Sequence, residues 1–165
     1  MVLASRRAFM AAAAAFLAAG RAIAAALKVP APGPSDTCPV CGMFVAKYPE
    51  WVATLVFADG KVAHFDGAKC HFKFILDMAR FDPAHRRDDV RTMAVTEYYN
   101  LDKVETFAAV YVVGSDVLGP MGHELVPFAS ATDAEDFRKD HGGKLVRSAA
   151  AVDWKFLIGL DEGRF

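Results

Sequence analysis

A β-hairpin followed at once by a helix is the pattern that most limits the folds open to this chain. Residues 51–57 are rich in β-branched and aromatic side chains, and residues 61–65 repeat that character after a short break. The break contains Asp59-Gly60, a pair typical of tight hairpin turns because glycine adopts positive φ angles without steric cost. The sequence therefore predicts two paired antiparallel strands.

The segment after the hairpin has the spacing of a helix. Residues 67–80 place apolar side chains three or four positions apart, which favours an amphipathic helix. Asp66 stands directly before this segment, and its carboxylate is suited to cap the first turn. A further strand over residues 90–98 completes a ββαβ unit.

The second half of the chain repeats this order. We predict strands over residues 107–113, 124–128 and 144–147, and a helix over 132–141 that opens at Thr132 and Asp133. A short helix over 153–160 closes the chain. The predicted fold is therefore α+β, with two ββαβ repeats packed together and a short C-terminal helix. Halves of about 70 residues are marginal alone, so we expect a shared packed interface.

The N-terminus has the composition of an export signal. Paired arginines at Arg6 and Arg7 precede an uncharged run of 13 residues, 8–20, and small residues suited to cleavage follow it. The arginine pair resembles a twin-arginine signal. A membrane anchor is disfavoured because a helix needs about 20 apolar residues to cross a bilayer. No cysteine stands at the cleavage zone, so we expect no lipid anchor.

These patterns divide the chain into four parts. We predict a signal peptide over residues 1–26, a Pro-rich extended tether over 27–37, and ββαβ halves over 38–100 and 101–165. Loss of the signal leaves 16 basic residues against 20 acidic ones, so the exported chain is mildly acidic. Such a balance offers no basic surface for nucleic acid. The expected location is the bacterial periplasm, where paired thiols tend to oxidise.

The richest chemistry lies in Cys38-Pro39-Val40-Cys41-Gly42-Met43. The two thiols are three positions apart, and a glycine after them lets the backbone fold back, which could bring Met43 alongside. A second group, Met121 and His123, lies in the connection between two predicted strands of the second half. In an extended backbone, residues two apart share a face, so we expect these two side chains to bind the same metal ion.

Thiolate, thioether and imidazole together form a soft donor set. Such ligands favour Cu(I) over hard cations, and a coordinating methionine disfavours zinc. Three other interpretations stay open: a structural disulfide between Cys38 and Cys41, a redox Cys-x-x-Cys motif, and a zinc site completed from His64, Cys70, His71 or His123. Neighbouring helix residues diverge by about 100°, so Cys70 and His71 do not easily share an ion, and we expect Cys70 to be structural.

Three stretches carry a resemblance to a known family. Residues 36–43 contain Cys-x-x-Cys-Gly-Met, residues 64–67 read His-Phe-Asp-Gly, and residues 111–128 contain Gly-Ser-Asp followed by Gly-Pro-Met-Gly-His-Glu. In this order they resemble the NosL family of nitrous oxide reductase accessory proteins. The similarity extends over nearly all of the chain after the signal. Within that family, Cys70 stands where a residue without a thiol is expected.

The resemblance implies a periplasmic Cu(I) chaperone, not an enzyme, that supplies copper for the copper–sulfide site of nitrous oxide reductase in denitrification. It implies as partners an ABC-type membrane maturation complex and apo nitrous oxide reductase. We also expect a monomer. Our first-choice Cu(I) ligands are Cys41, Met121 and His123, followed by Cys38 and Met43.

Overall fold

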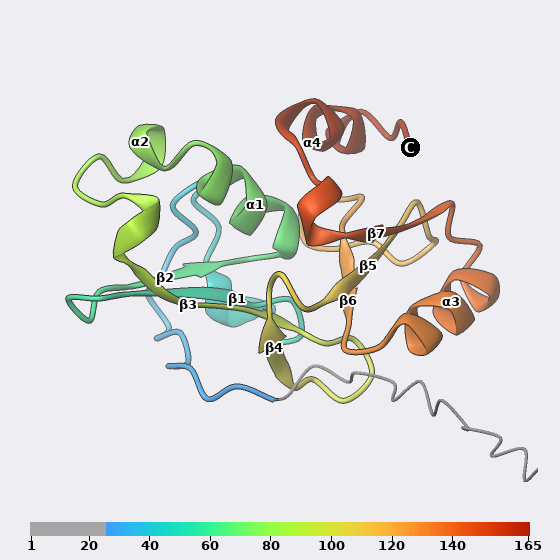
Figure 1. Ribbon diagram of the computed structural model, residues 1–165, viewed down its shortest axis with the longest axis horizontal. Helices are drawn as coiled ribbons and strands as arrows, with labels where there is room; N and C mark the ends of the chain where they lie inside the picture. Colours follow the sequence, from blue (N-terminus) through green and yellow to red (C-terminus); the bar gives the residue numbers. More distant parts are fainter. Residues whose placement is uncertain (1–25) are drawn as a thin grey trace, which may run out of the picture.

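The computed structural model describes residues 26–165, which form two antiparallel sheets and four α-helices (Figure 1). The predicted signal peptide lies outside the described residues, except for Ala26. Three short 3-10 helices, η1 (Val45–Lys47), η2 (Arg87–Asp89) and η3 (Ala149–Ala151), connect the larger elements. The predicted α+β class with two ββαβ repeats and a short closing helix is confirmed.

The first sheet has the strand order β2-β1-β3-β4. Its strands are β1 (Ala53–Phe57), β2 (Val62–Phe65), β3 (Val90–Thr96) and β4 (Lys103–Glu105), all paired antiparallel. The predicted hairpin is present, and Gly60 in its turn has a φ of 92°. Strand β4 was not predicted from the sequence. It extends the first sheet beyond residue 100, where we had placed the boundary between the halves.

The predicted helix over 67–80 is interrupted. Helix α1 (Ala68–Leu76) ends at Asp77, whose φ of −141° and ψ of 56° lie outside the helical region, and α2 (Met78–Phe81) begins directly after it. Aspartate side chains compete for backbone hydrogen bonds, which makes them poor residues for a helix interior. The prediction of one continuous helix was therefore wrong.

The predicted cap of α1 was also wrong. The N-cap residue is Gly67, which has no side chain to accept a hydrogen bond from the N–H groups of the first turn. Asp66 instead accepts a hydrogen bond from the Cys41 thiol. The first turn is satisfied from the second half of the chain, because Glu124 Oε1 accepts from the Lys69 N–H at 2.6 Å.

The second sheet has the order β6-β5-β7 and carries α3 on one side (Figure 1). Its elements are β5 (Val110–Val113), β6 (Val126–Phe128), α3 (Ala131–Asp140) and β7 (Leu145–Ser148), and α4 (Trp154–Asp161) follows. Helix α3 begins one residue earlier than predicted, because Ser130 rather than Thr132 caps it by accepting from the Asp133 N–H. Asp153 caps α4 in the same way.

Strand β5 joins the two halves because both of its faces are buried. Tyr111 and Val113 belong to the main core, whereas Val112 points to a smaller core beneath α3 that includes Phe137. Alternate side chains of a strand face opposite sides, so one strand serves both cores. The Tyr111 ring packs edge-on against Phe72 of α1 at 5.3 Å between centroids. The expected shared interface between the halves is present.

The predicted tether lacks helix and strand, as expected, but it lies against the first half. The Leu27 N–H donates to the Lys103 carbonyl at the end of the first sheet. Residues 29–32 line a hollow together with Val52 and Lys103. Within residues 26–165, the structure contains no helix with the length and apolar character of a membrane span.

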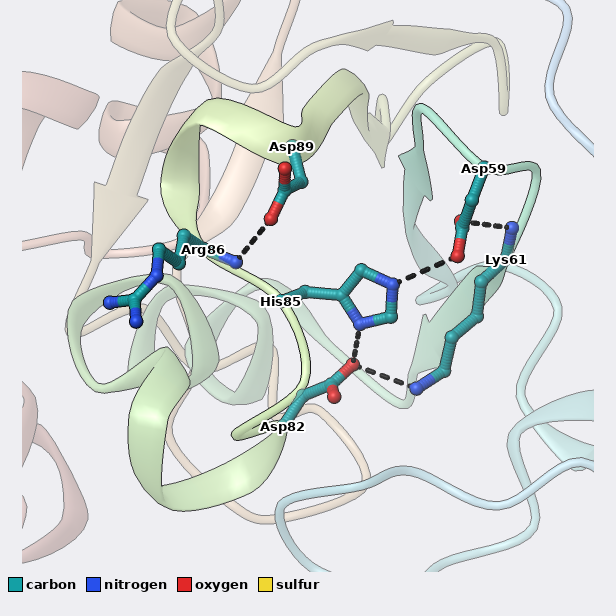
Figure 2. Close-up of polar contacts among 6 residues, drawn as sticks. All are labelled: Asp59, Lys61, Asp82, His85, Arg86 and Asp89. Atoms are coloured by element: carbon teal, nitrogen blue, oxygen red, sulfur yellow. Dashed lines mark hydrogen bonds and ion pairs between the residues drawn. The ribbon is translucent and has the colours of Figure 1, made fainter.

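A charged network lies at the turn of the first hairpin (Figure 2). His85 stands between two carboxylates, with Nδ1 3.0 Å from Asp82 and Nε2 3.0 Å from Asp59. Lys61 donates to the same Asp82 oxygen at 2.8 Å. These hydrogen bonds, first that to Asp59, raise the pKa of His85, and the bond from His85 lowers the pKa of Asp59. The protonated ring therefore joins the hairpin to the loop after α2.

This network predicts a pH-dependent contribution to stability. The folded pKa of His85 is raised, so its contribution is complete below the unfolded value of about 6.5 and is lost as the pH rises through the folded pKa. We expect His85→Gln to lower the free energy of unfolding more at mildly acidic pH than at alkaline pH. Denaturant titration at both pH values measures this difference, and an equal cost at both would contradict it.

Candidate metal centre

Four potential metal ligands meet at one point beneath the start of α1. One donor atom each from Cys38, Cys41, Cys70 and Asp66 lies within 4.8 Å of all the others. All three cysteines are free thiols, and Cys38, Cys70 and Asp66 are at most 3% exposed. Cys41 is half-buried and is the only one of the four with substantial access to solvent. The arrangement is a buried, sulfur-rich donor cluster with one accessible thiol.

A tight turn brings Cys38 and Cys41 together. The Cys38 N–H donates to the Met43 carbonyl at 2.8 Å, and the Gly42 N–H donates to the Cys38 carbonyl at 2.8 Å. Gly42 has a φ of 80°, in the left-handed region where residues with a Cβ are strained. Glycine after the second cysteine therefore lets the chain reverse, as the sequence predicted.

The other two donors come from the junction between β2 and α1. Asp66 directly follows β2, and Cys70 is the third residue of α1. The N–H groups of a first helical turn carry partial positive charge, which favours negative charge near this end of the helix. One short junction thus supplies a carboxylate and a thiol to the turn that holds the other two cysteines.

The hydrogen bonds within the cluster differ between its protonation states. As a thiol, Cys41 donates to Asp66 Oδ2 at 3.3 Å. As a thiolate it accepts from the Cys70 thiol, and this bond is the main reason that the pKa of Cys41 falls from 9.0 to about 7, against the effects of burial and Asp66. The Cys41 thiol therefore ionises near neutral pH.

Cys70 behaves in the opposite way. Its thiol donates to Cys38 and to Cys41, and these bonds together with burial raise its pKa far above the usual range. Asp66 Oδ1 is buried and has no hydrogen-bond partner among residues 26–165. A buried acceptor without a partner marks a position where a proton donor or a cation is accommodated. The cluster is thus suited to exchange a thiol proton for a metal ion.

The second predicted donor group lies in a turn, not in an extended segment. Gly119 and Gly122 form two backbone hydrogen bonds with each other, of 2.8 and 3.0 Å, so Met121 lies at the tip of the turn. The expected extended geometry was wrong, because Gly122 adopts a φ of 80°. The Met121 side chain is 45% exposed. The half-buried His123 ring packs edge-on against Phe165 at 4.9 Å.

This turn is attached to α1 immediately beside the thiol cluster. Lys69 precedes Cys70, is 2% exposed, and donates from Nζ to the Met121 carbonyl at 2.8 Å. Glu124 accepts from the Lys69 N–H and lies so close to Gly67 that any side chain at that position would collide with it. Burial raises the pKa of Glu124 to about 7, although Lys69 opposes the shift. The two halves therefore meet at the N-terminal end of α1.

The structure brings together some of the predicted ligands and separates others. Cys38 and Cys41 lie in the donor cluster, whereas His123 lies outside that group of four. The Met43 carbonyl stabilises the cysteine turn. Met121 and His123 belong to a neighbouring loop that touches α1 through Lys69.

The two histidines of the first half that were candidate zinc ligands are engaged elsewhere. His71 is fully buried, its Nε2 lies 3.0 Å from Thr106 Oγ1, and burial lowers its pKa to about 3. His64 Nδ1 lies 3.1 Å from Thr54 Oγ1, and burial lowers its pKa as well. Neither histidine belongs to the cluster. The expected divergence of Cys70 and His71 on the helix is present.

Sequence reasoning named Cys70 as a donor only in the zinc alternative, and it did not identify Asp66 as a donor. Cys70 was assigned a structural role, and Asp66 was assigned to the helix cap; the structure places both at the cluster instead. A third cysteine in an exported chain is itself a signal, because it is left over from any disulfide pair. The His-Phe-Asp-Gly motif was a second signal, since it places an acid between a strand and a helix.

Comparisons with known proteins agree with the arrangement described above. A scan against family models matches residues 28–155 to NosL. The chain belongs to the NosL family. Among solved structures, the copper chaperone NosL from Shewanella denitrificans is 25% identical, with a TM-score of 0.63. The alignment covers 78% of this chain and 97% of the Shewanella protein. A search of curated proteins finds no match. The NosL region includes the cysteine turn, the α1 junction and the Met121 loop.

The hydrogen bond from Cys70 predicts how Cys41 reacts. Only the thiolate form of Cys41 is alkylated. In the reduced protein without added metal, we therefore expect the alkylation rate of Cys41 to fall as the pH drops below its pKa of about 7. Cys70→Ala removes the donor and shifts this profile to higher pH. Cys70→Ser keeps a hydroxyl donor and serves as the control. Pulsed iodoacetamide labelling with peptide mass spectrometry measures the profile, and an unshifted profile in Cys70→Ala would refute the assignment.

Proposed function

We propose that this NosL-family protein is a periplasmic Cu(I) carrier that delivers copper for the copper–sulfide site of nitrous oxide reductase. The observation that carries the proposal is the buried thiol cluster at the junction before α1, with the Met121 turn attached to the same helix through Lys69. The thiol cluster contains Cys41, and the neighbouring turn presents Met121. Sulfur ligands of this kind select Cu(I). The similarity to a copper chaperone from Shewanella denitrificans supports the same cargo.

Cys41, Met121 and His123 are the proposed ligands for copper delivery, with Cys38 and Met43 as further donors. Cys41 and Met121 are accessible, so an acceptor's ligand can bind the copper before the carrier's ligands leave it. A metal site that exchanges its cargo needs such an open position, whereas a closed four-ligand site does not. The protein acts as a carrier and not as an enzyme.

The proposed partners are an ABC-type membrane maturation complex and apo nitrous oxide reductase. Export by the twin-arginine route places the carrier, as a monomer, in the same compartment as its acceptor. The exported chain is mildly acidic, which disfavours nucleic acid as a partner. Copper passes between bound states and is never released as a free ion.

Met121 provides the first test of the ligand set. We expect Met121→Ala to slow the transfer of bound Cu(I) to a chelator by about tenfold or more, because a soft donor of the delivery ligand set is lost. Its side chain is 45% exposed, so stability should stay close to that of the wild type. Leu118→Ala is the matched control, since Leu118 is an exposed apolar residue near the same turn. The rate of Cu(I) transfer to a chromophoric chelator is measured for both variants, and rates equal to that of the wild type would remove Met121 from the set.

Cellular assembly of nitrous oxide reductase provides the second test. In a denitrifying cell that lacks the gene for this chain, we expect nitrous oxide reductase to be deficient in its copper–sulfide site. The wild-type gene should restore the site and Cys41→Ser should not, because the proposed delivery depends on that thiolate. Metal analysis and the visible spectrum of the purified reductase measure occupancy. A complete site in the deletion strain would contradict the proposed acceptor.

A further inference from the structure

We propose that Cys38, Cys41 and Cys70 form an inner copper position, a three-thiolate site that holds Cu(I) before Cys41 passes it to the Met121 turn. This inference rests on the proposed function and extends it, because it adds Cys70 as a ligand and divides the path of the cargo into two positions. Cys70 was not among the ligands that the sequence predicted.

The geometry of the cluster fits three sulfurs around one ion. Metal–thiolate bonds are about 2.3 Å long, so three sulfurs around a planar centre stand about 4 Å apart. Donor atoms of Cys38, Cys41 and Cys70 already lie within 4.8 Å of one another. Small side-chain rotations therefore suffice to close the site, and the backbone turn around Gly42 does not need to open.

Burial makes this inner position different from the delivery ligands. Cys38 and Cys70 are 1% and 3% exposed, whereas Met121 is 45% exposed. A copper ion bound by the three thiolates is shielded from water and from oxidants in the surrounding compartment. Cys41 is the half-buried member of the cluster, so it is the ligand through which the ion leaves. The two positions share Cys41 as a common ligand.

The first turn of α1 partly offsets the charge of a loaded inner site. Three thiolates and one Cu(I) carry a net charge of −2, to which the Asp66 carboxylate adds, and Cys70 lies in the positively polarised first turn of α1. Lys69, the residue before Cys70, is buried as well, and its ammonium lies 3.2 Å from Asp161. On loading, the thiol protons leave to solvent, copper stays in the +1 state, and no electron is transferred.

Asp66 is assigned as a positioning residue and not as a ligand. Its Oδ2 accepts from the Cys41 thiol, which holds that side chain in the cluster. Carboxylate oxygens suit Zn²⁺ or harder cations better than Cu(I). If Zn²⁺ were the preferred ion, Asp66 would serve as the fourth ligand of a closed tetrahedral site. Asp66 is therefore expected to be a ligand if the site binds Zn²⁺, but not if it binds Cu(I).

The attachment of the Met121 turn to α1 gives the ion a short route outward. Lys69 lies directly before Cys70 in the chain and donates to the Met121 carbonyl at 2.8 Å. The side chain next to Cys70 in the chain is thus hydrogen-bonded to the backbone that carries Met121. Copper moves from the inner position by exchanging Cys38 and Cys70 for donors of this turn while Cys41 stays bound.

Copper K-edge X-ray absorption of the full-length, reduced protein loaded with one equivalent of Cu(I) tests the inner position directly. We expect a shell of three sulfurs without a nitrogen neighbour. We also expect Cys70→Ser to lower Cu(I) affinity at least about tenfold in chelator competition, because a thiolate is replaced by a poor ligand. Ala68→Ser is the matched control, since it places a hydroxyl at a buried position of the same helical turn.

The outcomes separate this inference from the proposed function. A wild-type shell with an imidazole nitrogen, together with unchanged affinity in a folded Cys70→Ser protein, would overturn the inner site and leave copper delivery standing. Failure of the wild-type protein to bind Cu(I) would overturn both. If Cys70→Ser does not fold, as judged by circular dichroism, the number of sulfur ligands that X-ray absorption finds in the wild-type protein still tests the inner site.

Asp66→Asn distinguishes copper from zinc at the same position. The amide has the size of the carboxylate and keeps an acceptor for Cys41, so we expect Cu(I) affinity to stay within about tenfold of the wild type. Titration with Zn²⁺ alone provides the comparison. Tighter binding of Zn²⁺ than of Cu(I) by the wild-type protein, with Zn²⁺ binding lost in Asp66→Asn, would contradict the assignment.

Discussion

The N-terminal end of α1 is the place on which the rest of this structure depends. Its first turn is satisfied by Glu124, a residue 55 positions away in the second half of the chain. Lys69 in the same turn is buried and donates to the Met121 carbonyl. Buried polar groups are costly unless they are paired, so these contacts fix how the halves fit together. They also attach the Met121 turn to the helix that carries Cys70.

This arrangement gives the cysteines distinct chemical roles. Cys70 is held by a rigid helix, Cys38 is held by the backbone of a tight turn, and Cys41 is the accessible member of the cluster. The hydrogen bond from Cys70 lowers the pKa of Cys41 to about 7. A thiol that ionises readily and faces solvent is suited to receive and release a metal ion. The buried thiols provide affinity instead, which is the physical basis for two positions.

The sequence predicted the sheets better than the helix ends. Runs of β-branched and aromatic residues and Asp59-Gly60 located the first hairpin, because strand pairing there depends on neighbouring residues alone. The cap of α1 was predicted wrongly, because a distant carboxylate took the place of the adjacent Asp66. Strand β4 was not predicted for a related reason. It has only three residues, and they form a strand because they pair with β3. Contacts distant in sequence overrode local preference in both cases.

The sequence by itself determined the soft donor types, the order of elements and the family. Residue types and short spacings carry that information, since two cysteines three positions apart meet in any tight turn. Only the tertiary structure decided that Cys70 and Asp66 join them, and that His123 lies outside the cluster. Cys70 is 29 residues from Cys41, and nothing in the local pattern says which face of α1 will be buried against the cysteine turn. That choice is made by packing, because the helix must bury Phe72 against Tyr111 while its first turn meets Glu124.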